Sequence, residues 1–410
     1  MPARLTVALL ALVASGLAAQ RPAPERVRPN DNRVAAGTLR DGVLSIAIEA
    51  RTAMWYPDGD DAPGAAIPVF AGAPGGASVP GPLLRARAGT IAEVALHNAL
   101  ARDTLLVHGL HDRPWRDAAR PAAITLLPGE RRRVRLRLDA PGTYLYWGTT
   151  TRRAANFRTG EDGQLTGAIV VDPATGPIPT DRVLVIGMWS DTVHRANTVR
   201  QRILGVLNGR SWPHTERLHH TVGDTVRWRV INASADLHPM HLHGFYFRVD
   251  ARGDGTVDTL LTGARRRLAV TENLLPAASM QVTWVPERAG NWLFHCHVPE
   301  HFGPRGSLGA RRPSAEPTVT LAGRAHDDHA RGGMNGLVMG IEVRPRPGAP
   351  RAAPPRDEAR PIRLLVRENV GSTAAVPLYG YALHERGPEP PRDSGYSRAP
   401  TLELVRGQRV

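Results

Sequence analysis

Residues 290–297 of the chain, GNWLFHCH, have a partial copy at residues 142–149, GTYLYWGT. A second pair of similar segments lies upstream, RAGTIAEV at residues 87–94 and VGDTVRWRV at residues 222–230. The two pairs follow one another in the same order, so the chain contains an internal repeat. Both copies alternate short runs rich in Val, Leu, Ile and Thr with Gly and Pro turns, at 91–96, 133–138, 225–231 and 280–284. This pattern predicts an all-β fold of antiparallel sandwiches.

The repeat and the composition divide the chain into five segments. Residues 1–19, with a positive start and an apolar run shorter than the ~20 residues of a membrane span, predict a cleaved export signal rather than an anchor. Two complete sandwiches are predicted at 38–175 and 178–345, called unit one and unit two below. Residues 346–361 form a Pro-rich linker. A third copy of the pattern begins at Val405, so 362–410 are predicted to start an incomplete third unit.

Charge and cysteine content exclude some classes of protein. The net charge of +14 comes from Arg residues that are scattered singly except at Arg131–Arg133 and Arg265–Arg267. Neither cluster has the interleaved aromatic residues that accompany nucleic-acid binding, so we expect no nucleic-acid partner. No later segment is apolar enough to cross a bilayer, which predicts a periplasmic or secreted protein. The chain has 1 Cys and cannot form an internal disulfide. In an oxidising compartment a lone thiol needs protection, and metal ligation would provide it.

Two histidine-rich motifs carry the candidate chemistry. The first is HPMHLHG at residues 238–244, and the second is HCHVPEH at residues 295–301. Because alternate residues of a strand share a face, Cys296 should point away from its neighbours His295 and His297. One strand can then serve two metal sites, with the thiolate at one and the imidazoles at the other. A thiolate with two imidazoles favours copper, with zinc as the main competitor.

HPMHLHGF and GNWLFHCHVPEH closely resemble the last copper-binding motifs of multicopper oxidases, the laccase-like enzymes built from cupredoxin domains. The resemblance implies tandem cupredoxin-like Greek-key β-sandwiches. It implies that type 1 copper is held by His238, Cys296 and His301, type 2 copper by His241, and the type 3 pair by His243, His295 and His297. It also implies a reaction in which single electrons enter at type 1 copper and reduce oxygen to water at a trinuclear cluster.

The axial ligand of type 1 copper is displaced from its usual place. The family has Met or Leu about ten residues after the Cys, where this chain has Gly306. The segment 301–332 resembles an insertion, and the following GMNGLVMG resembles the closing strand of the family. Met334 is therefore the axial candidate, with a three-coordinate site as the alternative. Met339 lies in an apolar run and is expected to pack in the core.

Unit one departs from the family pattern. The usual His-x-His-Gly is replaced by Leu106-Val-His108-Gly109, which leaves His108 as a single type 3 candidate or as a residue without a metal role. The usual second His-x-His is replaced by Trp147-Gly148-Thr149. Five of the family's eight cluster histidines remain. The missing ligands would come from the absent part of the third unit or from a neighbouring subunit, or else the cluster is lost.

These observations support three functions. The first is an oxygen-reducing multicopper oxidase that accepts electrons from a small molecule or a redox protein, with a homo-oligomer as one open assembly state. The second is a non-enzymatic electron-transfer or copper-carrying protein that uses the type 1 site alone. The third is a two-domain enzyme similar to copper nitrite reductases, which fits less well because the Cys site of those enzymes lies in the first domain.

Overall fold

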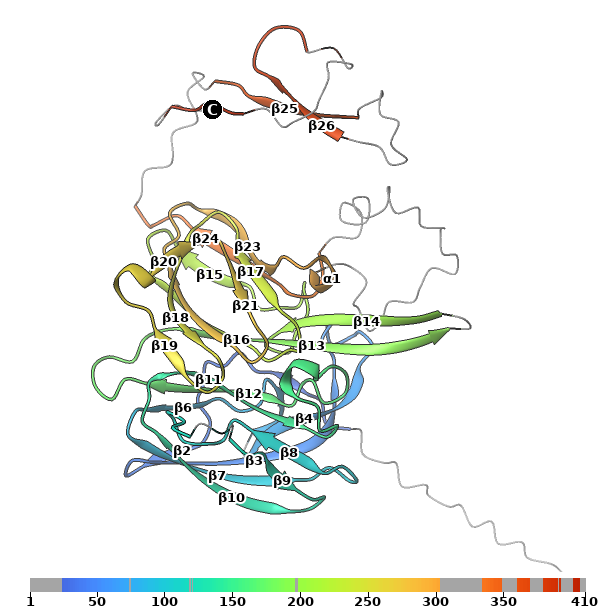
Figure 1. Cartoon of the computed structure of the whole chain (residues 1–410), viewed down its shortest axis with the longest axis vertical. Coiled ribbons are helices and arrows are strands. Elements are labelled where there is room, and N and C mark those ends of the chain that lie inside the picture. Colours follow the sequence, from blue (N-terminus) through green and yellow to red (C-terminus); the bar gives the residue numbers. More distant parts are fainter. Residues whose placement is uncertain are drawn as a thin grey trace, which may run out of the picture.

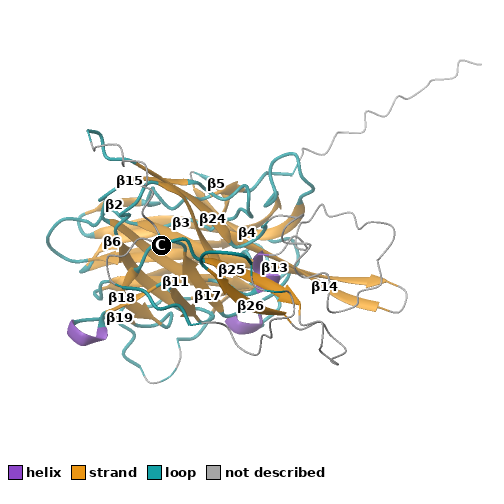
Figure 2. Ribbon diagram, turned by 90° about the horizontal axis from the view of Figure 1, so that it is seen from above, coloured by secondary structure: helices purple, strands orange, loops and turns teal. Residues whose placement is uncertain are grey.

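The computed structural model describes residues 24–73, 75–117, 119, 121–195, 198–302, 334–348, 360–368, 379–389, 391 and 401–405. The predicted export signal, most of the predicted 301–332 insertion and most of the Pro-rich linker lie outside these residues. Strands dominate the fold (Figure 2). The described residues contain one α-helix, the single turn α1 (Pro299–Phe302), and two short 3-10 helices, η1 (Ala155–Phe157) and η2 (Gly263–Arg265). The all-β prediction is confirmed.

The first 150 or so described residues form two sheets that pack face to face. The first sheet has the order β1-β5-β4-β3-β7-β10, with β2 beside β3, and the second has the order β6-β12-β11-β8-β9. The strands of the first sheet are β1 (Arg28–Pro29), β2 (Thr38–Arg40), β3 (Val43–Trp55), β4 (Ala65–Ala73), β5 (Gly76–Val79), β7 (Thr90–Asn98) and β10 (Arg131–Leu138). Those of the second are β6 (Leu84–Arg87), β8 (Leu105–His108), β9 (Ile124–Leu126), β11 (Gly142–Thr149) and β12 (Thr166–Asp172).

Two further sheets form the second sandwich, drawn in green to orange in Figure 1. The third sheet has the order β14-β13-β16-β22-β18-β19, with β20 beside β18, and the fourth has the order β15-β24-β23-β17-β21. The third comprises β13 (Arg182–Arg195), β14 (Thr198–Leu207), β16 (Val226–Asn232), β18 (Phe247–Gly253), β19 (Asp258–Leu260), β20 (Arg267–Ala269) and β22 (Ser279–Trp284). The fourth comprises β15 (Leu218–Thr221), β17 (His238–Leu242), β21 (Thr271–Leu274), β23 (Gly290–Cys296) and β24 (Val338–Arg344).

The second and fourth sheets have the same connectivity. In the second sheet β6 pairs parallel with β12, and β12-β11-β8-β9 continue antiparallel. In the fourth sheet β15 pairs parallel with β24, and β24-β23-β17-β21 continue antiparallel. The repeated segments 142–149 and 290–297 thus lie at equivalent places, the first on β11 and the second on β23 and the residue that follows it.

An apolar layer joins the two sandwiches. Strand β7 buries alternate residues, as expected for a strand with one covered face, whereas every residue of β12 is buried. Side chains of β11 and β12 pack against β13 and β16 through the cluster Leu83, Leu145, Ala168, Val170, Val183, Val185, Ile231 and Ala233. The second and third sheets are therefore covered on both faces, and the two sandwiches together form a stack of four sheets (Figure 1).

A buried ion network crosses the same boundary. Arg85 of β6 bonds Asp172 (2.8 Å) and Asp181 (2.7 Å), and Asp181 also accepts from Arg229 of β16 (2.6 Å). The carboxylates of Asp172 and Asp181 are almost fully buried, so their arginine partners must offset the free-energy cost of burying each negative charge. These bonds fix the orientation of one sandwich on the other.

The predicted third unit contributes one described hairpin, β25 (Arg363–Glu368) with β26 (Tyr379–His384). That this hairpin begins a third sandwich stays a prediction. In the parts of the chain that the structure describes, no helix has the length and apolar character needed to cross a membrane.

Candidate metal centre

Strands β17 and β23 lie side by side and carry both histidine-rich motifs. Their antiparallel register places Met240 opposite Cys296 and His241 opposite His295. Cys296 belongs to the core between the third and fourth sheets, whereas His297 is exposed. The alternation predicted for Cys296 and its flanking histidines is therefore what the strands adopt.

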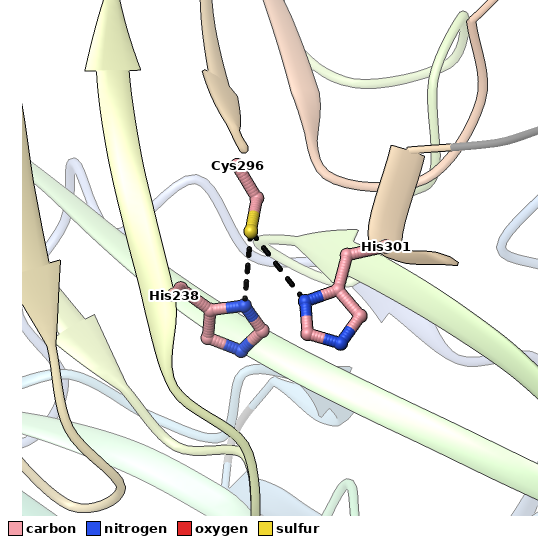
Figure 3. Close-up of side chains that lie close together, drawn as sticks. All are labelled: His238, Cys296 and His301. Atoms are coloured by element: carbon pink, nitrogen blue, oxygen red, sulfur yellow. Dashed lines mark hydrogen bonds between the residues drawn. The ribbon is translucent and has the colours of Figure 1, made fainter. Parts of the chain in front are cut away.

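The thiol of Cys296 faces two imidazoles. Its Sγ lies 3.5 Å from Nδ1 of His238, at the start of β17, and 3.4 Å from Nδ1 of His301, in α1 (Figure 3). The ligand atoms of these three residues all lie within 4.8 Å of one another, and all three residues are buried. The backbone N–H of Val298 also donates to the sulfur (3.4 Å). We call this group the thiolate site.

The electrostatics of the thiolate site fit a bound cation. Burial raises the pKa of the Cys296 thiol to about 11, and the charge of Asp236 adds to the rise. Burial lowers the pKa of His238 to about 3, with nearby His301 contributing. The His238 imidazole is thus neutral and offers a lone pair, while the thiol needs a positive charge to become a thiolate. A soft metal ion satisfies all three groups, and one sulfur with two nitrogens is a copper-thiolate donor set.

The remote nitrogens of the two imidazoles meet acceptors from one loop. Nε2 of His238 lies 2.6 Å from Oγ of Ser234, and Nε2 of His301 lies 3.5 Å from Oδ2 of Asp236. Both rings therefore direct Nδ1 at the sulfur and Nε2 away from it.

A second cluster lies on the other face of β23. The ligand atoms of His241, His295 and His297 lie within 4.8 Å of one another, and Nε2 of His243 lies 2.9 Å from Nε2 of His295. We call these four residues the imidazole cluster. His295 is buried, while His243 and His297 are exposed, so the cluster opens to the surface of this chain.

Hydrogen bonds orient the rings of the imidazole cluster. Nδ1 of His241 bonds the carbonyl oxygen of Val270 (2.8 Å), and Nδ1 of His295 bonds the carbonyl oxygen of Cys296 (2.7 Å). A carbonyl only accepts, so both Nδ1 atoms carry the proton and both Nε2 atoms keep a lone pair. Burial lowers the pKa of His295 to about 4, with neighbouring histidines adding, which keeps it neutral.

Met334 is half-buried beside the helix of His301. The next residue, Asn335, donates its N–H to the carbonyl oxygen of Phe302 (2.9 Å), and Leu337 donates to that of His301 (2.9 Å). These bonds hold the segment after Met334 against α1, and the role of Met334 as axial ligand stays a prediction. Met339 lies in the core, as predicted.

The structure does not bring His108 to the imidazole cluster. His108 lies on β8 of unit one and stacks on Trp147 with ring centroids 4.0 Å apart, and the guanidinium of Arg158 lies 5.0 Å from the same indole ring. In the pairing of β8 with β11, His108 lies opposite Trp147, just as His241 lies opposite His295 in the pairing of β17 with β23.

Gly148 occupies the position in unit one that is equivalent to Cys296, and it is enclosed by Leu105, Phe70 and Leu165. Unit one has apolar packing where unit two has a thiolate.

Sequence reasoning missed three residues around the thiolate site. Ser234 and Asp236 contact the ligand rings, and Met240 is a buried cross-strand neighbour of Cys296. A signal for the first two was present, because Asn232-Ala-Ser-Ala-Asp236 is a run of turn-forming residues immediately before the first ligand.

Comparison with known proteins agrees with this geometry. Two family models, both described as multicopper oxidase, match residues 76–175 and 179–306, together more than half of the chain. This chain belongs to the multicopper oxidase family. The resemblance seen in the two motifs is confirmed, and copper is the cofactor of the family.

Individual relatives match parts of the chain. A probable nitrite reductase–hydroxylamine oxidoreductase fusion protein of Kuenenia stuttgartiensis is 28% identical over 242 residues, covering 55% of this chain and 26% of that protein. L-ascorbate oxidase of Cucumis sativus is 34% identical over 128 residues, covering 28% of this chain and 20% of the oxidase. The chain thus spans about a quarter of the length of these relatives or less.

Solved structures of the family share the fold. The blue copper oxidase of Nitrosomonas europaea matches with a TM-score of 0.50 and 19% identity, over 73% of this chain and 85% of that one. The multicopper oxidase mgLAC matches with a TM-score of 0.51 and 21% identity, over 76% and 88%. The prediction of tandem cupredoxin-like sandwiches is confirmed.

Proposed function

We propose that this protein oxidises a donor by single electrons at a type 1 copper in the thiolate site and passes the electrons to oxygen at the imidazole cluster. His238, Cys296 and His301 hold the type 1 copper, with Met334 as axial ligand. His241 serves type 2 copper, and His243, His295 and His297 serve the type 3 pair. His108 lies in a different sheet, so it would serve as a type 3 ligand only across an interface with a second copy of this chain.

One observation carries this proposal: β23 presents the sulfur of Cys296 to one ligand group and the rings of its two neighbours to another. Copper bound in the thiolate site supplies a one-electron couple, and copper bound in the imidazole cluster supplies the place where oxygen is reduced. The protein orients the rings through the Val270 and Cys296 carbonyls and keeps water from the sulfur by burial.

The imidazole cluster needs ligands from elsewhere to become trinuclear. Leu106, Trp147 and Thr149 stand where the family has histidines, and His108 lies in a different sheet. The open face at His243 and His297 leaves room for residues of a further domain or of a second copy of this chain. We propose that one of these completes the cluster, and that the donor is a small molecule or redox protein.

The signal-like residues 1–19 support a periplasmic or secreted location. An exported protein meets copper and oxygen outside the cytoplasm, and its lone thiol is protected there by the metal.

Copper stoichiometry and oxygen uptake test the proposal together. The copper-loaded protein should bind about four coppers per assembled active unit, show a thiolate-to-copper absorption band and consume oxygen when a donor is added. A protein that stays colourless and retains no copper after dialysis would refute it.

The missing unit-one ligands favour a second candidate, an electron-transfer or copper-carrying protein that uses the thiolate site alone. That function requires one copper per chain, the same absorption band and no oxygen uptake. The two candidates therefore differ in metal content as well as in activity.

A further inference from the structure

We propose that Ser234 and Asp236 are positioning residues that set the reduction potential of the copper in the thiolate site. They act on the metal through the remote nitrogens of His238 and His301. This inference rests on the proposed copper-thiolate site but not on oxygen reduction.

The contacts are paired across the site. Each imidazole presents Nδ1 to the sulfur of Cys296 and Nε2 to the loop 232–236, at 2.6 Å for Ser234 and 3.5 Å for Asp236. Each ligand ring therefore has a polar partner at both edges. One loop of five residues provides both outer partners.

The loop is itself fixed by the buried side chain of Asn232. Its Nδ2 donates to the carbonyl oxygens of Asp236 (2.7 Å) and Leu274 (2.9 Å). Its Oδ1 accepts from the backbone N–H of Ser234 (2.9 Å) and from the hydroxyl of Ser234 (2.7 Å). These bonds tie the loop to β21 and to the end of β16.

The bond from Ser234 to Asn232 decides the tautomer of His238. A serine hydroxyl has one proton, and that proton goes to the Asn232 oxygen, which can only accept. The hydroxyl oxygen, 2.6 Å from the ring, therefore receives the Nε2–H of His238. With its proton on Nε2, His238 has the lone pair of Nδ1 free for the metal.

Asp236 adds a charge where Ser234 adds none. Its carboxylate is 47% exposed, while the His301 ring that it faces is 5% exposed. A negative charge 3.5 Å from a ligand imidazole stabilises the doubly charged cupric ion more than the singly charged cuprous ion. The carboxylate should therefore lower the reduction potential of the site.

The test uses the copper-loaded full chain, with the potential measured by redox titration of the thiolate-to-copper band. Asp236→Asn should raise the potential while the band remains, and Asp236→Glu should return it towards the wild-type value. Asp224→Asn is the matched control, because Asp224 is an exposed carboxylate in the turn between β15 and β16. We expect that control to leave the potential unchanged.

Ser234→Ala tests the uncharged partner. Losing the acceptor leaves the buried Nε2–H of His238 unpaired, so we expect weaker copper retention and a broadened electron paramagnetic resonance spectrum of the cupric site. Ser234→Thr keeps a hydroxyl and should retain more copper than Ser234→Ala.

The outcomes separate this inference from the proposed function. If the wild-type band is present and Asp236→Asn shifts the potential no more than Asp224→Asn, the role of Asp236 is refuted and the type 1 site stands. If the potential shifts as expected in a protein without oxygen uptake, the positioning role is supported and the oxidase activity is refuted.

Discussion

His295 donates its Nδ1–H to the carbonyl oxygen of Cys296, 2.7 Å away, although the two side chains point to opposite faces of β23. The bond fixes the ring of His295 so that its Nε2 faces Nε2 of His243 at 2.9 Å. The backbone of the thiol-bearing residue thus orients a ligand of the other cluster. Mutations at the two clusters should nevertheless have separable effects, because no side chain belongs to both.

Replacing the sulfur should remove the colour of the protein without unfolding it. Cys296→Ser loses the thiolate and places a hydroxyl in the core, at a cost of about 1–3 kcal/mol in the free energy of unfolding. We expect no thiolate-to-copper band and an unchanged far-ultraviolet circular dichroism spectrum. The control Met339→Leu conserves buried volume, should cost less than about 1.5 kcal/mol and should keep the band. A persistent band in Cys296→Ser would show that the band does not arise from the thiolate site.

Removing one ring of the imidazole cluster should abolish oxygen uptake and leave the thiolate site intact. His243→Ala is expected to keep the absorption band and to lose oxygen uptake. His219→Ala is the control, because His219 is an exposed residue of β15 that pairs with Glu342 outside both sites. Undiminished oxygen uptake in His243→Ala would place the oxygen-reducing centre elsewhere.

The turn before β24 should be sensitive to a single methyl group. Gly336 has φ +73° and a Cβ there would lie 2.2 Å from the carbonyl oxygen of His301. Gly336→Ala should therefore displace α1, cost about 3 kcal/mol in stability and weaken copper retention. Gly348 has a similar φ of +76° and open space around it, so Gly348→Ala should cost only about 1 kcal/mol. Equal copper loss in both variants would contradict the role of the contact.

Acid should destabilise unit one partly through His111. Burial, and then the charge of Arg113, lower the pKa of His111 to about 4. Because the unfolded chain binds this proton near pH 6.5 and the folded chain does not, stability should fall as pH falls from 6.5 towards 4. His111→Gln removes that contribution and leaves an oxygen that can accept from Arg113. Denaturant midpoints at pH 7 and pH 4.5 should therefore differ less for the variant than for the wild type, and an equal difference would disprove the assignment.

The sequence predicted those features that depend on local alternation. The opposed directions of Cys296 and His295 follow from the period of a strand, and the repeat at 142–149 and 290–297 predicted two sheets with the same connectivity. The contacts of Asp236 with His301 could not be predicted, because they join a loop to a helix 65 residues away, at a distance set by the packing of α1. The stacking of His108 on Trp147 likewise depends on the register of β8 and β11, which the repeat alone does not fix.

The crowding around Gly148 limits how unit one could change. A cysteine introduced there would bring its first side-chain carbon within 3.1 Å of Leu105 and Phe70, before any sulfur or metal is added. Hydrocarbon fills the volume that a second thiolate centre would occupy. Metal binding in this half would require the side chains of Leu105 and Phe70 to move away first, so packing maintains the difference between the halves.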